Sequence, residues 1–192
     1  KKKKKSKVIK KKKKSKVIKR MKKNRMRENR MADRIAVSLS ENTALPSWFE
    51  NVAPFTQKAL DVLGFSGEEI SILLCDDAYM SFLNKTYRGI EGATDVLSFE
   101  NGASYIDEEG VTWKCAGDIA ISLDTLSKNA AAFETDEDSE LKRLIVHGLL
   151  HLNGYDHGKE HIEAGKAPEC DMLVIQEQAL AKLCGEKIIG NL

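Results

Sequence analysis

The sequence of 192 residues lacks any long apolar run. No stretch reaches the roughly 18 consecutive apolar residues that a membrane-spanning helix needs. The basic N-terminal region is also not followed by the apolar segment that is typical of a secretory signal peptide. We therefore expect a cytoplasmic protein with no membrane partner.

Cysteines are few, and they are spaced without a pattern. The four lie at Cys75, Cys115, Cys170 and Cys184, and no two of them form a C-x-x-C pair. A disulfide framework or a thiolate metal site is the alternative. We interpret these residues as buried or free thiols in a reducing compartment.

Basic residues are scarce outside the N-terminal segment. Residues 1–30 hold 19 of the 31 Lys and Arg residues but one of the 29 acidic residues, Glu28. Residues 31–192 therefore carry 12 basic and 28 acidic residues, a net charge of −16. The chain is divided into a basic tail and an acidic body.

The tail repeats itself, because KKKKSKVIK at 2–10 recurs at 11–19. A charge run of this density cannot build a packed core, so we expect the tail to be disordered. Two interpretations stay open. The tail attracts RNA phosphates, or it is low-complexity coding ahead of a later start at Met21, Met26 or Met31. A transit peptide is disfavoured, because the tail is poor in Arg and has no clear amphipathic pattern.

The acidic body is expected to form a single domain from residue 31 to residue 192. Strands are predicted from apolar patterns at 34–39, 69–75, 94–100 and 117–123. Helices are predicted over 47–64, from Asp76 or Asp77 to Gly89, from Asp124 toward Phe133, over 135–154, and over roughly 169–183. Residues 101–116 are expected to form a loop or a hairpin. Because strands and helices do not alternate strictly, we predict an α+β fold, a small mixed sheet of about four strands packed with helices.

The helix predicted over 135–154 has an unusual composition. It opens with acidic residues, which suit the N-terminus of a helix. Its apolar residues cover several faces, as expected of a helix that is buried in the middle of a fold. This central helix also carries the most informative motif of the chain, HGLLHLNGYDH at 147–157.

This motif holds three of the four histidines of the chain. His147 and His151 are four residues apart, so on a helix they lie on one face and can direct two nitrogens at one point. Gly154 is well placed to end the helix in the left-handed conformation, after which the chain can bring His157 back as a third ligand. The alternative is two core histidines and an unrelated loop histidine.

Three imidazole ligands leave the fourth position of a tetrahedral metal site open to water, as in catalytic zinc centres. We therefore predict a metal site of His147, His151 and His157. Zinc is the first expectation, and Ni²⁺, copper or cobalt would also suit imidazole ligands.

The spacing equals that of the metzincin proteases, H-E-x-x-H-x-x-G-x-x-H, except that Gly148 replaces the glutamate. That glutamate is the general base of the protease. A metal-dependent peptidase or other hydrolase stays open as an alternative, with a base supplied from elsewhere. Gly148 itself indicates either a close approach of substrate or backbone, or tight helix packing.

A second dense stretch, residues 83–100, contains Arg88 immediately before a glycine. A guanidinium group offers a planar set of donors that suits phosphate. The alternative for Arg88 is a surface ion pair. Asn84 lies one helical turn earlier and would share its face.

These residues carry a family resemblance. HGLLHLNGYDH, together with LNKTYRG, TDVLSF and GDIAIS, resembles the YbeY endoribonucleases, which are bacterial rRNA maturation factors. The similarity covers roughly residues 69–183 in the same order. Ala93 and Glu100 depart from it, because the family usually has prolines on either side of TDVLSF. The tail lies outside the pattern.

The resemblance implies a zinc-dependent, single-strand-specific endoribonuclease that acts in 16S rRNA maturation and ribosome quality control. It implies that His147, His151 and His157 bind the metal, and that Arg88 is the arginine of the active-site cleft. A non-catalytic ribosome-assembly factor with a structural metal is the other alternative. Asp156 either orients a ligand or shapes the turn, and His161 is interpreted as a surface residue or a proton carrier.

Overall fold

The structure is a computed structural model that describes residues 32–158, 160 and 168–190. The basic tail at 1–30 and His161 were both singled out in the sequence. They lie outside the described residues.

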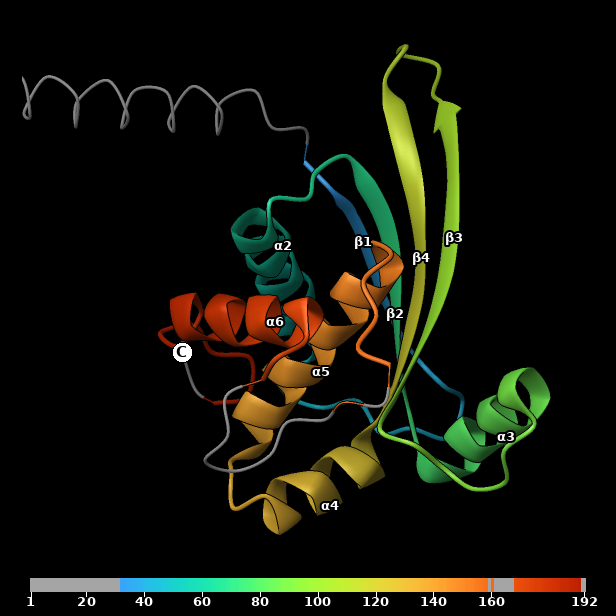
Figure 1. Cartoon of the computed structure of the whole chain (residues 1–192). Coiled ribbons are helices and arrows are strands. Elements are labelled where there is room, and N and C mark those ends of the chain that lie inside the picture. The colour runs from blue at the N-terminus through green and yellow to red at the C-terminus, as the bar shows by residue number, and fades with distance from the viewer. Residues whose placement is uncertain (1–31, 159, 161–167, 191–192) are drawn as a thin grey trace, which may run out of the picture. The chain divides into compact units, whose positions relative to one another are not determined.

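Four strands of the described chain form one mixed sheet (Figure 1). The strands are β1 (Arg34–Leu39), β2 (Glu68–Cys75), β3 (Val96–Ile106) and β4 (Thr112–Ser122). Their order in the sheet is β1-β2-β4-β3, with β1, β2 and β4 parallel and β3 antiparallel to β4. The predicted α+β fold with a small mixed sheet is confirmed.

Helices connect and cover the strands (Figure 1). They are η1 (Phe49–Asn51, a 3-10 turn), α2 (Val52–Leu63), α3 (Asp77–Arg88), α4 (Leu123–Ala132), α5 (Glu137–Leu152) and α6 (Asp171–Lys182). Within the described residues, none of these helices has the length and apolar character needed to cross a bilayer.

The two faces of the sheet are covered unequally. On one face, Ile72 of β2 and Ile119 of β4 are fully buried in a core shared with α2, α5 and α6. On the other face, Met80 and Leu83 of α3 pack with Ala120 of β4 in a smaller cluster. Burying each large apolar side chain contributes roughly 1.5–3 kcal/mol. The larger cluster is therefore the main source of stability.

α5 is the central helix of the larger core, as the sequence predicts. Seven of its apolar residues are completely buried: Leu141, Leu144, Ile145, Val146, Leu149, Leu150 and Leu152. Asp136 caps its first turn, because its carboxylate accepts a hydrogen bond from the backbone N–H of Ser139 at 2.7 Å. The helix that carries two of the three clustered histidines is thus held firmly between the sheet and α6.

The helix predicted over 47–64 begins later than expected. Residues 49–51 form a 3-10 turn, and α2 starts at Val52 without a side-chain cap. Pro54 falls in the first turn of α2, where its missing N–H has no partner within the helix in any case. The end is as predicted, because Gly64 has a left-handed φ of 92°.

The hairpin alternative for residues 101–116 is confirmed, with longer strands than predicted. β3 begins at Val96 rather than Thr94 and continues to Ile106, and β4 begins at Thr112 rather than Gly117. Tyr105 faces Trp113 across the pair, and such aromatic pairs stabilise antiparallel strands. Gly102 and the nearby acids therefore do not end β3.

Candidate active site

α5 places two histidines one turn apart on the same face. The rings of His147 and His151 have centroids 4.6 Å apart, and their Nε2 atoms are separated by 3.1 Å. Both nitrogens therefore point into the same small volume. This is the consequence of the four-residue spacing on a straight helix.

A tight turn after α5 brings the third histidine to the same place. Gly154 has a left-handed φ of 77°, and the backbone N–H of Tyr155 returns to the carbonyl of Leu150 at 3.1 Å. The ring of His157 then lies 5.1 Å from that of His147, centroid to centroid. One nitrogen from each histidine lies within 4.8 Å of the others. The three rings meet as the spacing predicts, and metal binding stays a prediction.

Two hydrogen bonds to acceptors outside the cluster fix which nitrogens face inward. Nδ1 of His147 lies 3.0 Å from Oε1 of Gln176 on α6, and Nδ1 of His157 lies 2.7 Å from the carbonyl oxygen of Glu160. Both oxygens accept, so each Nδ1 must carry the proton. Each Nε2 is then left with its lone pair, as in metal sites with an oriented imidazole.

The ionisation of the imidazoles also suits a cation. Burial lowers the pKa of His147 to about 4, and this outweighs the opposing hydrogen bond to Gln176. Burial, followed by the charge of His157, lowers the pKa of His151. Both rings are therefore neutral at pH 7, which is the form that coordinates a metal. The donor set fits a divalent ion with nitrogen ligands.

The histidines open into a cleft of about 860 Å³. Its walls are the C-terminal end of α3, residues 94–100, one face of α5 and the turn at 154–158. Segments far apart in the sequence therefore meet around the three rings. The segments TYRG, TDVLSF and HGLLHLNGYDH, noted separately in the sequence, contribute to one concave site.

Arg88 lies in this cleft, at the end of α3. The helix stops there because Gly89 adopts the left-handed conformation. The loop that follows is held to the helix by the buried Asn84, whose Nδ2 donates to the carbonyl of Gly92 at 2.9 Å. Among the described residues, none forms a hydrogen bond or ion pair with the guanidinium group. Its charge contributes to the lowered pKa of His151. The surface ion pair that was the alternative is not seen within residues 32–158, 160 and 168–190.

A second arginine of the cleft was not singled out in the sequence. Arg143, one turn before His147 on α5, is bound by Glu140 at 2.6 Å and by Asp95 at 3.2 Å. Two carboxylates therefore neutralise it. No local signal distinguishes Arg143, because its partner Asp95 is 48 residues away.

Asp156 and Gly148 have structural contacts. The Asp156 carboxylate accepts from the backbone N–H of Gly158 at 3.1 Å, which supports its role in shaping the turn. A Cβ on Gly148 would lie 2.7 Å from the side chain of Ile119 on β4. Tight helix packing therefore explains the glycine.

Comparisons with known proteins find relatives over most of the chain. The family model described as Endoribonuclease YbeY matches residues 34–183. A protein with that name from Treponema denticola is 48% identical over 147 residues, 76% of this chain and 91% of its own length. One from Aquifex aeolicus is 36% identical over 152 residues, 79% of this chain and 96% of its own length.

A solved structure supports the fold. The solution structure of TM1509 from Thermotoga maritima aligns with a TM-score of 0.50 at 24% identity, covering 79% of this chain and 90% of that one. At this identity the likeness concerns the fold alone. The sequence matches show the family as well as the fold, since they cover most of this chain and nearly all of the two relatives. The chain belongs to the endoribonuclease YbeY family.

Proposed function

We propose that the protein is a zinc-dependent endoribonuclease that cleaves single-stranded RNA. Family membership supports a nuclease that cleaves RNA phosphodiester bonds. The substrate that we propose is precursor 16S rRNA, in rRNA maturation and ribosome quality control in the cytoplasm, with small-subunit ribosomal proteins as partners. We assign the activity to one domain, residues 31–192.

The observation that carries the proposal is the composition of the cleft. Three imidazoles converge on its wall, and Arg88 lies in the same cavity, so metal-binding and phosphate-binding groups face one volume. A structural metal site is normally closed by four protein ligands. Here the described residues supply three, and the cavity lies beside them.

His147, His151 and His157 would hold the ion. A divalent ion bound there supplies a Lewis acid that polarises water or a phosphoryl oxygen. Zinc is favoured by the three nitrogen donors, although Ni²⁺ and other divalent ions also bind imidazole. The hydrogen bonds that His147 donates to Gln176 and His157 donates to the Glu160 carbonyl keep these two rings turned toward that position.

Arg88 would bind the scissile phosphate. Its guanidinium group forms no hydrogen bond or ion pair with the described residues, so its donors are available to phosphate oxygens. Charge that develops on those oxygens during cleavage would be stabilised by the same donors. Arg143 is less suited to this role, because Glu140 and Asp95 already occupy its guanidinium group.

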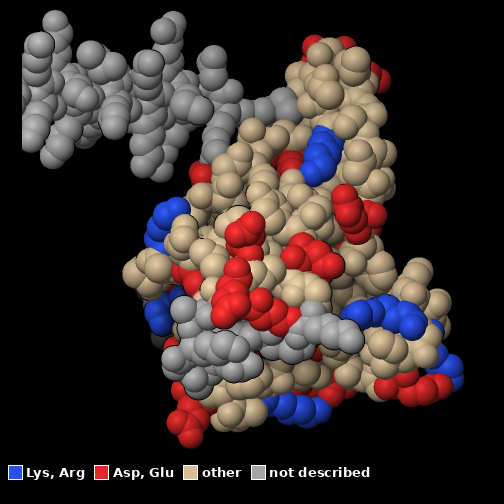
Figure 2. Space-filling model, viewed as in Figure 1, with Lys and Arg blue, Asp and Glu red and all other residues tan. Residues whose placement is uncertain are grey.

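The charge of the body makes Arg88 more important. Residues 31–192 carry a net charge of −16, and Figure 2 shows acidic groups spread over the face that holds α5 and α6. Phosphate is repelled by this surface at long range. Binding of RNA therefore depends on local cations in the cleft, and on docking partners of the ribosome.

Metal analysis of the purified full chain, combined with RNA cleavage, tests the proposal. We expect about one equivalent of zinc in the wild type, cleavage of a single-stranded RNA, and no cleavage of the same sequence in a duplex. His151→Ala should lose both metal and cleavage. A 2′,3′-cyclic phosphate at the product end indicates attack by the ribose 2′-hydroxyl, whereas a 5′-phosphate with a free 3′-hydroxyl indicates attack by water.

The same experiment separates the alternatives. Metal in the wild type without any histidine-dependent cleavage would contradict the nuclease and favour an assembly factor with a structural metal. Cleavage that survives in His151→Ala would place the chemistry outside the histidine cluster. In either case the folded state of the variant is checked by circular dichroism.

A further inference from the structure

An aromatic pair stands at the rim of the cleft. The rings of Tyr87 on α3 and Phe99 on β3 pack edge to face, with centroids 5.0 Å apart and an interplanar angle of 66°. Tyr87 is 65% exposed, although it is a large aromatic residue. Its neighbour in the sequence is Arg88, and both residues line the cleft that holds the histidines.

The same pair also lines a second hollow, on the face of the sheet against which α3 packs. This hollow has a volume of about 560 Å³, and its wall includes Leu73 and Leu83. Tyr87 and Phe99 are the residues that the two cavities share. The pair therefore forms the ridge between the histidine cleft and a largely apolar recess.

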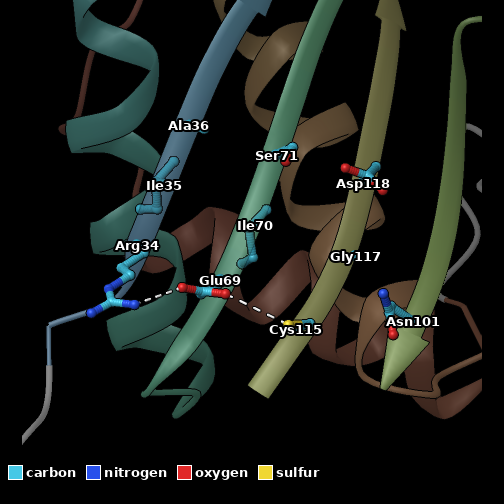
Figure 3. Close-up of a pocket in the computed structure, with 10 residues that line it drawn as sticks. All are labelled: Arg34, Ile35, Ala36, Glu69, Ile70, Ser71, Asn101, Cys115, Gly117 and Asp118. Carbon is cyan, nitrogen blue, oxygen red and sulfur yellow. Dashed lines mark hydrogen bonds and ion pairs between the residues drawn. The ribbon is translucent and has the colours of Figure 1, made fainter. Parts of the chain in front are cut away.

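Two acidic residues of the sheet, Glu69 and Asp118, lie on this face. Figure 3 shows Glu69 and Ser71 on β2 and Asp118 on the neighbouring strand β4. Glu69 forms an ion pair with Arg34 at 2.9 Å, and Asp118 lines both the recess and the neighbouring pocket drawn in Figure 3. No Lys or Arg among the described residues lines the apolar recess. A phosphate is therefore favoured at Arg88, on the cleft side of the ridge, and disfavoured on the other side.

We propose that Tyr87 and Phe99 form a stacking surface for one unpaired base of the RNA substrate, next to the phosphate that Arg88 binds. This inference rests on the proposed function. Exposed aromatic rings bind bases by stacking, and this binding needs a base whose face is not already covered by its neighbours in a duplex. The pair thereby gives a physical reason for preference for single strands.

The exposure of Tyr87 alone does not support this inference. Phe82, on the same helix, is 59% exposed and pairs with Tyr79, but it lines neither the histidine cleft nor the recess. The position of Tyr87 beside Arg88, on the ridge between the two cavities, is what distinguishes it. Phe82 is therefore a matched control for Tyr87.

Binding of a fluorescein-labelled single-stranded RNA to the full chain, with a chelator present to keep the RNA intact, tests the proposal. Tyr87→Ala should weaken binding about 5- to 150-fold, the range expected for loss of one stacked base. Phe82→Ala should bind like the wild type. Tyr87→Trp, which keeps an aromatic face, should bind at least as tightly as the wild type.

An abasic nucleotide moved along the RNA identifies the stacked base. At one position it should weaken binding to the wild type by a similar factor, and it should weaken binding to Tyr87→Ala no further, because the lost contact is the same. Two results would overturn the proposal. One is that Tyr87→Ala binds the RNA like the wild type. The other is that the loss of affinity from Tyr87→Ala and the loss from the abasic nucleotide multiply at every position.

These measurements do not depend on cleavage. If the coupling between Tyr87 and one base is found but metal-loaded protein cleaves no RNA, the stacking surface stands and the nuclease proposal fails. If the protein cleaves RNA in a histidine-dependent way but Tyr87→Ala has the wild-type KM, the nuclease stands and the stacking surface fails.

Discussion

The Nε2 atoms of His147 and His151 lie 3.1 Å apart. Nδ1 of His147 donates to Gln176, so Nε2 of His147 presents a lone pair to the other ring. Burial lowers the pKa of both imidazoles, so both rings are neutral at pH 7 and can act as ligands to one metal ion.

Gln176 should therefore tune metal affinity without being a ligand. Gln176→Leu removes the acceptor that orients His147, and we expect zinc affinity to fall about 10- to 100-fold. The measurement is competition with a chromophoric chelator. The control is Gln178→Leu, an exposed position on the same helix, which should keep wild-type affinity. Equal affinities for the two variants would show that Gln176 has no role at the site.

Arg88→Ala should lower kcat/KM for single-stranded RNA by about 100-fold, as expected for loss of a group that stabilises charge on the reacting oxygens. Metal content and the unfolding midpoint should not change, since Arg88 makes no ion pair with the described residues. Lys85→Ala is the matched control, because Lys85 is an exposed cation of the same helix that pairs with Glu91 at 2.8 Å. Similar activities for both variants would exclude a specific role for Arg88.

The stability of the α3 region should depend on pH through Asp77. Burial acts to raise the pKa of this carboxyl, but hydrogen bonds from Lys128, Ser122 and Thr125 lower it to about 2. The ordinary value is 3.8, so the unfolded chain binds more protons between these pH values. The free energy of unfolding should therefore fall as the pH drops from about 4 to 2.

Urea unfolding at several pH values measures this effect. In Asp77→Asn the loss of stability between pH 4 and pH 2 should be smaller than in the wild type. Glu41→Gln, at an exposed position, should retain the wild-type profile. Parallel profiles for wild type and Asp77→Asn would mean that Asp77 does not contribute to acid sensitivity.

Deletion of residues 1–30 tests whether the basic tail is an RNA tether. The tail holds 19 of the 31 Lys and Arg residues, so its removal should weaken RNA binding and make the affinity less dependent on salt. Affinity measured at several salt concentrations gives the slope. An unchanged slope would show that the tail makes no phosphate contacts.

The parts of the site that the sequence predicts are those with local causes. His147, His151 and His157 converge because a helical period and one left-handed glycine place them, and all of these signals lie within 11 residues. The burial of α5 follows from apolar residues on several of its faces. The end of α3 at Gly89 follows from the same kind of local rule.

The parts that the sequence does not predict depend on contacts between distant segments. Gln176 reaches His147 from another helix, 29 residues later, and nothing in its neighbourhood marks it. The pairing of Arg143 with Asp95 is equally distant. The length of the β3–β4 hairpin is set by cross-strand pairs such as Tyr105 with Trp113, which local propensity does not reveal.

Gly148 connects the packing of the core to the site. Alanine favours a helix by about 1 kcal/mol over glycine, but here its Cβ would meet the fully buried Ile119 at 2.7 Å. Overpacking of this kind costs about 1–3 kcal/mol. We expect Gly148→Ala to lower the free energy of unfolding by about 1 kcal/mol and to reduce metal affinity, because α5 must move away from β4.

Two further variants isolate this contact in urea unfolding. Gly185→Ala adds a Cβ that meets no atom within 4 Å, so it should not destabilise the protein. Ile119→Val removes the Cδ1 atom that lies closest to the new methyl group. Combined with Gly148→Ala, it should give a protein more stable than the sum of the two single effects predicts, since the methyl group fills the vacated space. Strict additivity would mean that the backbone, rather than Ile119, absorbs the added methyl group.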